Sequence, residues 1–432
     1  MSSAVPIAPL PGYEQAADLV AAFAARLGQA RPSVECVQLG AAAGRVLARA
    51  ICADRDQPPF ARSTRDGFAC RAADASANEL MLIAGATRAG EPPAGPLPNG
   101  AAWEIMTGAP VPADADAVVM IEHVKTSDGR IRLLPPRKVM VGENIVPQGA
   151  QAREGDELLP EGTAITFAQI ALAATCGCAS LDVYLRPRVA ILATGDELVP
   201  VDAEPGPGQI RNSNAPMLAA MVGAAGGEPW VLPTAADDAR VLDKSLAAAA
   251  EADMLLISGG VSAGKFDLVE PALARAGAHI HFTGVRIQPG KPLVFGELPR
   301  GEARTLPFFG LPGNPVSSAV TFLLFAAPVL GALAGCRQSG SRFGPRFGPR
   351  FALARLAAAT DKHGKPGLTR FLPASCTFNS PAGQLPEVAL VPWQGSGDLA
   401  ALARSNCFLV VPEEAHRLEA GAIVRILLSW SQ

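Results

Sequence analysis

The spacing of apolar and polar positions changes several times along the chain, which indicates more than one folding unit. Alanine- and leucine-rich stretches with scattered charges at 13–29 and 40–50 predict two helices near the start of the sequence. A third helical pattern covers 166–176, with no obvious sheet of its own. We therefore expect a helical linker domain assembled from 8–51 and 142–184.

A strand-like pattern separates these two helical segments. Short apolar runs alternate there with glycine and proline turns, at 79–84, 101–106, 117–124 and 131–134. This pattern predicts an inserted β domain over 52–141. A second β domain, resembling a barrel, is predicted over 351–432, with strands near 352, 388, 407 and 423.

Between the two β domains, residues 185–335 alternate continuous apolar strands with helices. The predicted strands cover 188–193, 230–232, 253–258, 279–287, 293–297 and 305–309. The predicted helices cover 212–225, 238–250 and 267–276, and a long helix follows Asn314. Strands that are apolar on both faces indicate a parallel sheet covered by helices on each side. The fold class is thus α/β and β multidomain, with a doubly wound α/β domain over 185–335.

Composition narrows the class of protein. The 432 residues are 49% hydrophobic and 18% charged, which argues against disorder, and a net charge of -3 gives no electrostatic reason to expect nucleic acid or an acidic membrane. Eight cysteines without a regular framework, and no secretory signal, favour the cytoplasm. The uncharged stretch 316–335 is long enough to span a bilayer, but its serines, threonine and glycines favour a buried helix.

Ligands of open α/β sheets bind beyond the carboxyl ends of the strands, so the loops there hold the candidate chemistry. Two of these loops are rich in glycine and open a helix. Glycine admits close approach of the backbone, and helix N-termini present free N–H groups to an anion. The same turns also serve as plain strand-to-helix connections. The candidate binding residues in these loops are Thr194, Gly195, Ser258, Gly259, Gly260, Ser262, Gly313 and Asn314.

Carboxylates in the same loops raise the odds of a ligand site. Asp196, Glu197, Asp237 and Asp267 would crowd negative charge beside an anion, which is reasonable if Mg2+ bridges them. Alternatively Asp237, Asp238 and Asp267 are helix N-caps, and for Asp238 we favour the cap. No Ser/His/Asp triad can be assembled, so catalysis would rest on positioning and electrostatics.

Three further features stand outside this group. Lys291, in a Pro-Gly-Lys-Pro turn, is equally a solvated lysine or an anion ligand. The polar run around Asp66 is either an ordinary turn or a ligand loop, because a glycine follows a cluster of donors. The tandem Arg-Phe-Gly-Pro repeat over 342–350 is interpreted as a linker in preference to an anion-gripping element.

Seven segments, taken in order, resemble the molybdopterin molybdenumtransferase family, which includes the cofactor-synthesis domain of gephyrin. They are Arg62-Ser-Thr-Arg-Asp-Gly-Phe68, Met106-Thr-Gly-Ala-Pro-Val-Pro112, Thr194-Gly-Asp-Glu-Leu198, Ser258-Gly-Gly-Val-Ser-Ala-Gly264, Pro289-Gly-Lys-Pro292, Gly310-Leu-Pro-Gly-Asn-Pro315 and Gln394-Gly-Ser-Gly397. The resemblance implies four domains like those above and an elongated homodimer whose cleft is made by both subunits. It also implies a reaction that inserts molybdate into adenylated molybdopterin, releases AMP and needs Mg2+.

The resemblance also assigns roles to residues. Asp66 and Glu197 match catalytic positions, and Glu197, Asp237 and Asp267 match acidic positions near the metal. Residues expected around molybdate and the pterin are Lys291, Pro292, Ser317 and Ser396, with Arg370 as a displaced candidate. Possible macromolecular partners are a molybdopterin adenylyltransferase and apo-molybdoenzymes.

This sequence departs from the family pattern at three places. Gln288 stands where the family has a lysine, Gln151 where it has an acidic residue, and Pro373 where its C-terminal pattern has an arginine. The departures leave room for a weakened paralogue that carries the cofactor as a scaffold. A third possibility, the adenylylating activity itself, is disfavoured by the three extra domains and by the Asp66 motif.

Overall fold

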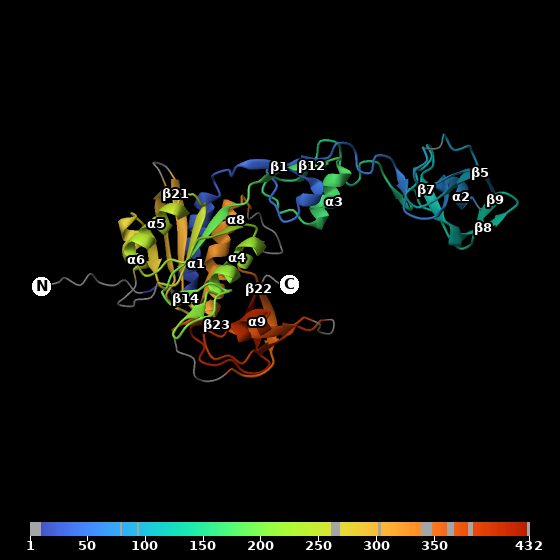
Figure 1. The fold of residues 1–432 in the computed structure, drawn as a ribbon. Coiled ribbons are helices and arrows are strands. Elements are labelled where there is room, and N and C mark those ends of the chain that lie inside the picture. Colours follow the sequence, from blue (N-terminus) through green and yellow to red (C-terminus); the bar gives the residue numbers. More distant parts are fainter. Residues whose placement is uncertain are drawn as a thin grey trace.

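The computed structural model describes residues 10–77, 80–92, 95–260, 268–300, 304–337, 348–360, 367–378 and 383–429. Figure 1 shows an elongated molecule with its parts in a row. An α/β unit lies next to the C-terminal β unit, a small unit around α3 follows, and the inserted β unit forms the far end.

The α/β unit is built on a six-stranded sheet. Its strands in spatial order are β16 (Glu228–Val231), β13 (Arg188–Ala193), β17 (Met254–Ser258), β21 (Arg304–Leu311), β20 (Val294–Arg300) and β18 (His279–Thr283). The first four run parallel, as predicted, but β20 is antiparallel to both of its neighbours. Three residues separate β20 from β21, too few for the crossover that a parallel pair needs.

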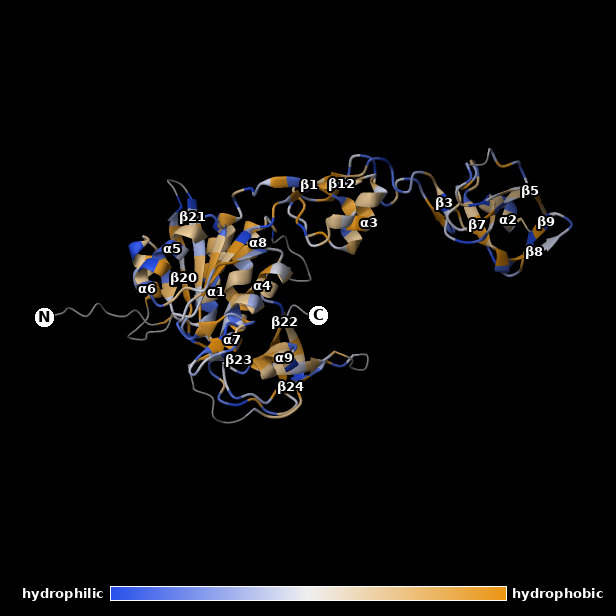
Figure 2. Ribbon diagram, in the orientation of Figure 1, coloured by the Kyte–Doolittle hydropathy of each residue, from blue (hydrophilic) through white to orange (hydrophobic). Residues whose placement is uncertain are grey.

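Helices cover both faces of this sheet. One face packs on α1 (Tyr13–Leu27), α4 (Asn214–Ala224), α7 (Pro315–Thr321) and α8 (Ala327–Leu333), and the other on α5 (Ala239–Ala249) and α6 (Val269–Arg275). Adjacent strand residues take opposite sides: Ile191 belongs to the first core and Leu192 to the second. The doubly wound prediction is therefore confirmed, and Figure 2 shows hydrophobic residues concentrated in these strands and helices.

The apolar stretch after Asn314 is a core element of this unit. It runs through α7, a π-helical turn (Phe322–Ala326) and α8 without interruption. Residues 315–333 are long and apolar enough to cross a membrane by composition, but 83% of the apolar window is buried inside the protein. Burial in the protein accounts for its apolar character, as the sequence favoured.

The two helices expected near the start of the chain have different outcomes. The pattern over 13–29 forms α1, which packs on α8 in the α/β unit rather than on the segment 142–184. The prediction of a helix over 40–50 is wrong, because only a 3-10 turn (Leu39–Ala41) forms there. Beyond it the backbone of Val46 and Leu47 bridges to Ala164 and Val183, and these long-range pairings override the helix propensity of the alanines.

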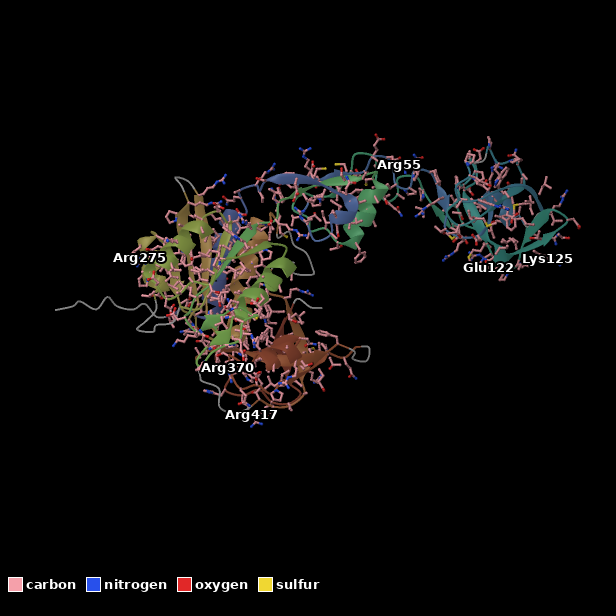
Figure 3. All side chains as sticks on the ribbon, in the orientation of Figure 1. Arg55, Glu122, Lys125, Arg275, Arg370 and Arg417 are labelled. Atoms are coloured by element: carbon pink, nitrogen blue, oxygen red, sulfur yellow. The ribbon has the colours of Figure 1, made fainter. Side chains whose placement is uncertain are left out.

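The small unit around α3 (Phe167–Thr175) contains strand pairs that the sequence did not predict. They are β1 (Val34–Gln38) with β12 (Ser180–Tyr184), and β2 (Ile51–Cys52) with β11 (Glu157–Leu159). A third pair, β3 (Arg62–Ser63) with β10 (Ile145–Val146), leads into the inserted unit. Figure 3 labels Arg55 on the connection between the small unit and the insert.

The inserted unit contains a six-stranded sheet, in agreement with the β pattern. Its order is β7 (Ala117–Met120), β4 (Gly67–Cys70), β6 (Ala101–Ile105), β5 (Met81–Thr87), β9 (Arg130–Leu133) and β8 (Val124–Ser127). Short helical elements, α2 (Ala72–Ser76) and a 3-10 turn (Ile121–His123), complete it. Asp66 directly precedes β4, a strand that the sequence had left as part of a turn.

The C-terminal unit is a closed five-stranded barrel. Its strands run β23 (Thr369–Thr377), β24 (Glu387–Leu390), β22 (Phe351–Leu356), β26 (Ile423–Leu428) and β25 (Cys407–Val411), and pairing of β25 with β23 closes the ring. Of these, β23 was not predicted. A sixth strand, β19 (Ile287–Gln288), comes from the α/β segment, and α9 (Leu399–Arg404) precedes β25. A further parallel pair, β14 (Leu198–Val199) with β15 (Ile210–Arg211), lies beside the α/β sheet.

Candidate functional site

A pocket of about 670 Å³ opens beyond the carboxyl ends of β13, β17 and β21, where the sequence predicted a ligand. The predicted residues that line it are Thr194, Glu197, Ser258, Gly259, Pro292, Gly313 and Asn314. β15 and the starts of α4 and α9 also contribute. They supply Arg211, Asn212, Ser213, Asn214 and Leu399, which were not predicted as site residues, and Gly397, the last residue of the predicted motif 394–397, lies beside them.

The glycines of the pocket are required by close packing. Gly259 has a φ of 94°, and a Cβ atom there would lie 2.6 Å from the carbonyl oxygen of Thr194. Gly260 has a φ of 63°, and its Cβ would lie 2.6 Å from Val269 and 2.9 Å from Thr194 Oγ1. Both positions combine a left-handed backbone with no room for a side chain, so the loop can pass directly beneath the pocket.

Asn214 ties together three segments at the floor of the pocket. Its Nδ2 donates hydrogen bonds to Ser258 Oγ at 2.8 Å and to the carbonyl oxygen of Gly313 at 2.7 Å. Asn212 acts within its own segment, since its Oδ1 accepts from the backbone of Ala215 at 3.1 Å. Asn214 thus fixes the start of α4 against the ends of β17 and β21.

Two buried polar atoms beside the pocket remain available to a ligand. Thr194 is 3% exposed and Asn214 is 9% exposed. Among the residues that the structure describes, Thr194 Oγ1 and Asn214 Oδ1 have no hydrogen-bond partner. Leaving such atoms unpaired is costly, so both are suited to contact a polar molecule in the pocket.

Carboxylates gather at the rim. Asp196 Oδ1 accepts a hydrogen bond from the backbone of Asp237 at 3.0 Å, while Glu197 lies in the pocket wall. Desolvation and the charges of Asp196 and Glu197 raise the pKa of Asp237 above its usual value. Asp238 caps α5 by accepting from the backbone of Arg240 and Val241, as the favoured interpretation predicted. Asp267 and Ser262, two other predicted site residues, lie outside the described part of the chain.

The barrel closes one side of the pocket. Asn314 begins α7, and its Nδ2 donates to Ser396 Oγ at 2.9 Å across the junction between the two units. The backbone of Val316 donates to the carbonyl oxygen of Ser396 at 3.0 Å. Ser317 is buried in the first turn of the same helix. Thus the predicted residues Asn314, Ser317 and Ser396 lie in one neighbourhood, although they are far apart in sequence.

Lys291 and Arg370 differ in their availability. Lys291 is exposed in the turn next to Pro292, which lines the pocket. Arg370 is 5% exposed, and its Nη2 donates to the carbonyl oxygens of Ala415 at 3.1 Å and His416 at 3.3 Å. Figure 3 shows Arg370 at the top of the barrel, next to the α/β unit. The guanidinium therefore crosslinks the barrel, even though it was a candidate for the cofactor.

Asp66 directly precedes β4 of the inserted unit, and Figure 1 shows this unit at the far end of the molecule from the α/β unit that holds Glu197. Asp66 Oδ1 accepts hydrogen bonds from the backbone N–H of Thr107 at 2.6 Å and from the Thr107 hydroxyl at 2.8 Å. Both bonds hold the pKa of Asp66 below its usual range, and the bond from the Thr107 backbone has the larger effect. Two of the predicted motifs, at 62–68 and 106–112, are thus joined, and they present an exposed, ionised carboxylate.

Comparison with known proteins covers nearly the whole chain. Residues 12–177 match the MoeA N-terminal region (domain I and II), 190–332 match a probable molybdopterin binding domain, and 355–429 match the MoeA C-terminal region (domain IV). The molybdopterin molybdenumtransferase of Bacillus subtilis is 35% identical over 415 residues, covering 93% of this chain and 91% of the relative. The chain belongs to the MoeA family.

Other MoeA-family proteins agree with this assignment. The molybdopterin molybdenumtransferase of a Nostoc species is 37% identical over 336 residues, 76% of each chain. The crystal structure of a molybdopterin biosynthesis MoeA protein from Pyrococcus horikoshii OT3 superimposes with a TM-score of 0.77 at 28% identity. That match covers 98% of this chain and 100% of the other, so the multidomain fold predicted from sequence is confirmed.

The departures from the MoeA-family pattern fall in structured positions. Gln288 belongs to β19 and pairs with Arg370 of β23, next to the turn that holds Lys291. Gln151 is exposed, and its backbone donates to the carbonyl oxygen of Gln57 at 2.8 Å, near the crossing into the insert. Pro373 lies within β23, opposite Phe408 of β25.

Proposed function

We propose that this protein is a molybdopterin molybdenumtransferase, which inserts molybdate into adenylated molybdopterin and releases AMP to give the molybdenum cofactor. The observation that carries the proposal is the match of relatives with this activity at 30–37% identity over most of the chain. The pocket supports it, because it lies in the segment that matches a molybdopterin binding domain. Glycine turns and unpaired buried oxygens there suit a phosphate-bearing pterin.

The carboxylates at the rim fit Mg2+. Oxygen donors are the ligands this ion prefers, and Glu197 and Asp237 supply them, while the family resemblance adds Asp267. Burial, followed by the negative charges of Asp196 and Glu197, raises the pKa of Asp237, and a bound cation would favour its ionised form. Bound there, Mg2+ would neutralise phosphate charge during loss of the adenylate. The chain's own residues then hold the substrate: Asn214 and Thr194 offer polar contacts, and Lys291 offers a cation to molybdate.

We further propose that the protein works as a homodimer in the cytoplasm. Asp66 is exposed and ionised, and it belongs to the insert, which lies at the far end of the molecule from the α/β unit. A partner subunit's insert placed over the pocket would supply Asp66 opposite Glu197. An adenylyltransferase that delivers the substrate and apo-enzymes that receive the cofactor are the expected macromolecular partners.

The test is AMP release from adenylated molybdopterin in the presence of molybdate and Mg2+. We expect molybdate-dependent release that Asp66→Ala abolishes and that a chelator of Mg2+ suppresses. Mixing Asp66→Ala with Glu197→Gln subunits checks the dimer, since one of the two sites in the mixed dimer would keep both residues. Pterin binding without any AMP release would contradict the enzyme and favour the carrier scaffold, to which the neutral Gln288 points. ATP consumption would instead revive the adenylylating activity.

A further inference from the structure

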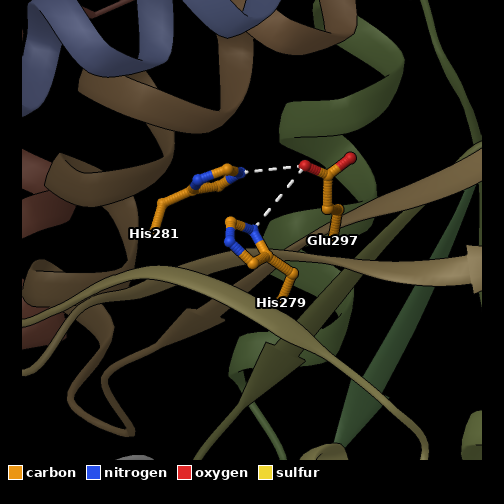
Figure 4. A group of neighbouring side chains, drawn as sticks. All are labelled: His279, His281 and Glu297. Atoms are coloured by element: carbon orange, nitrogen blue, oxygen red, sulfur yellow. Dashed lines mark ion pairs between the residues drawn. The ribbon is translucent and has the colours of Figure 1, made fainter.

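The α/β unit carries a second cluster of ligating side chains, well away from the pocket. His279 and His281 lie on the edge strand β18, and Glu297 lies on the adjacent strand β20. His279 and Glu297 are direct partners across these antiparallel strands, so their side chains leave the same face of the sheet. His281 lies at a bulge of β18, between the paired residues Ile280 and Phe282, and its side chain is also directed toward Glu297 (Figure 4).

The three side chains point toward one another (Figure 4). His281 Nε2 lies 3.2 Å from Glu297 Oε1, and His279 Nδ1 lies 3.9 Å from the same oxygen. Each residue offers one ligand atom, and these three atoms all lie within 4.8 Å of one another. A tetrahedral ion with bonds of about 2.1 Å needs its ligands about 3.4 Å apart, so side-chain rotations are sufficient to reach that geometry.

We propose that His279, His281 and Glu297 form a binding site for a divalent cation of the zinc class, with two imidazole nitrogens and one carboxylate oxygen as ligands. Imidazole selects Zn2+, Co2+ or Ni2+ over Mg2+, which prefers oxygen ligands alone. Three protein ligands leave a fourth position for water. The ion would link the exposed edge strand β18 to β20.

The surroundings support a ligand role for His281. Its ring is held between Phe23 of α1 and Phe295 of β20, with centroid distances of 5.5 and 4.9 Å. Despite its short distance to Glu297, Nε2 makes no aligned hydrogen bond with any residue that the structure describes.

Arg26 shares Glu297 with the histidines without excluding an ion. Its Nη2 donates to Glu297 Oε1 at 3.1 Å and to Oε2 at 3.4 Å, and it is largely exposed at the end of α1. Oε2 can keep this bond while Oε1 binds the cation. Arg26 then becomes an outer partner that orients the carboxylate, an arrangement common around protein metal sites.

The cluster is separate from the molybdenum chemistry. Glu297 pairs with Pro307 of β21, whereas the pocket begins after Leu311. Four residues of strand amount to about 13 Å at ~3.3 Å per residue. Loss of this site therefore leaves the pocket residues in place, and a metal titration without pterin or molybdate tests it independently of the proposed function.

The experiment is a calorimetric titration in which Zn2+ is added to the whole chain after treatment with a chelator. Excess Mg2+ is added to compete with Zn2+ for carboxylate-only sites, and alkylation blocks the exposed thiols of Cys36 and Cys52. We expect one saturable Zn2+ per chain. His279→Gln, at an exposed position, should lower the affinity by more than about 100-fold, because loss of an outer partner alone usually costs about 10–100-fold.

Three variants sharpen the result. His281→Gln and Glu297→Gln should also lose the site, whereas His416→Gln, an exposed histidine on the barrel, should bind Zn2+ as the unmodified protein does. With Cu2+ in place of Zn2+, the electron paramagnetic resonance spectrum should show nitrogen hyperfine structure from two imidazoles, and His279→Gln should lose this two-nitrogen pattern. Because His279 is exposed, this test does not depend on whether the His281 and Glu297 variants fold. Absence of a saturable site, or equal affinity in His279→Gln and His416→Gln, would overturn the proposal.

Discussion

Replacement of Asn214 by alanine should loosen the floor of the pocket. The change removes the two hydrogen bonds from Nδ2 to Ser258 Oγ and to the Gly313 carbonyl oxygen, at 2.8 and 2.7 Å. Each buried bond contributes about 0.5–1.5 kcal/mol net, so the pair contributes about 1–3 kcal/mol. Water can enter from the pocket and solvate the abandoned oxygens, which keeps the loss within this range.

Amide hydrogen exchange is the suitable assay, because a chain of several units does not unfold in one step. Amides at the ends of β17 and β21 should lose protection by about 5–150-fold, the equivalent of 1–3 kcal/mol. Amides of the barrel and the insert should be unchanged. The KM for adenylated molybdopterin should rise in parallel, since the same loops line the pocket.

Ser213→Ala is the matched control. Ser213 also lines the pocket at the start of α4, but its side chain makes no capping hydrogen bond, so the change should stay within about 0.5 kcal/mol. Equal exchange rates in Asn214→Ala and Ser213→Ala would refute the reasoning that Asn214 joins the three segments. A uniform loss of protection across all units would refute the prediction that the effect of Asn214→Ala is confined to the pocket.

Three other changes test separate parts of the site. Thr107→Val removes one of the two donors to Asp66, so the depressed pKa rises toward its ordinary value; the acid limb of the pH–activity profile should move to higher pH while the rate near neutrality stays the same. An unmoved limb would show that Asp66 does not control it. Gly259→Ala places a Cβ 2.6 Å from the Thr194 carbonyl at a φ of 94°, which costs about 1–3 kcal/mol and should raise the KM for the pterin, whereas Gly223→Ala, in open space within α4, should not. Arg370→Met removes the guanidinium's hydrogen bonds to two barrel carbonyls and should destabilise the barrel by about 1.5–3 kcal/mol. Faster amide exchange in β23 and β25 would show this loss. A higher KM for molybdate with unchanged exchange would instead indicate that Arg370 is a cofactor ligand.

Much of the α/β unit could be predicted because its strands are apolar on both faces. The runs at 188–193 and 253–258 gave β13 and β17, and the rule for the carboxyl ends of strands then pointed to Thr194 and Ser258. The barrel strands alternate more weakly, and β23 was missed. It contains a proline, which cannot donate to a strand ladder, and an arginine, so its sequence signal is weak although β19, β24 and β25 all pair with it.

Asn214 shows why part of the pocket could not be predicted. In the sequence, the run Asn212-Ser-Asn214 has the composition of an ordinary helix start, and that explanation is sufficient for its residue types. The structure gives Asn214 a different task, since its side chain reaches Ser258 and Gly313, 44 and 99 positions away. One local signal could have marked Asn214 as a candidate site residue: it lies in a polar helix start that follows the end of a strand in an α/β sheet.

Asp66 illustrates a second limit, which concerns the arrangement of whole units. Periodicity reports which residues face a core, and the insert has its own core around Phe68 and Ile131. Nothing in that pattern depends on how far the insert lies from the pocket. The motif predicts only a turn or a ligand loop, and the structure adds that Thr107 holds an exposed carboxylate there. The proposed meeting of Asp66 with Glu197 would depend on contact between subunits. A mixed dimer of Asp66→Ala and Glu197→Gln chains tests the contact between subunits separately from the motif itself, because it restores activity only if the two residues come from different subunits.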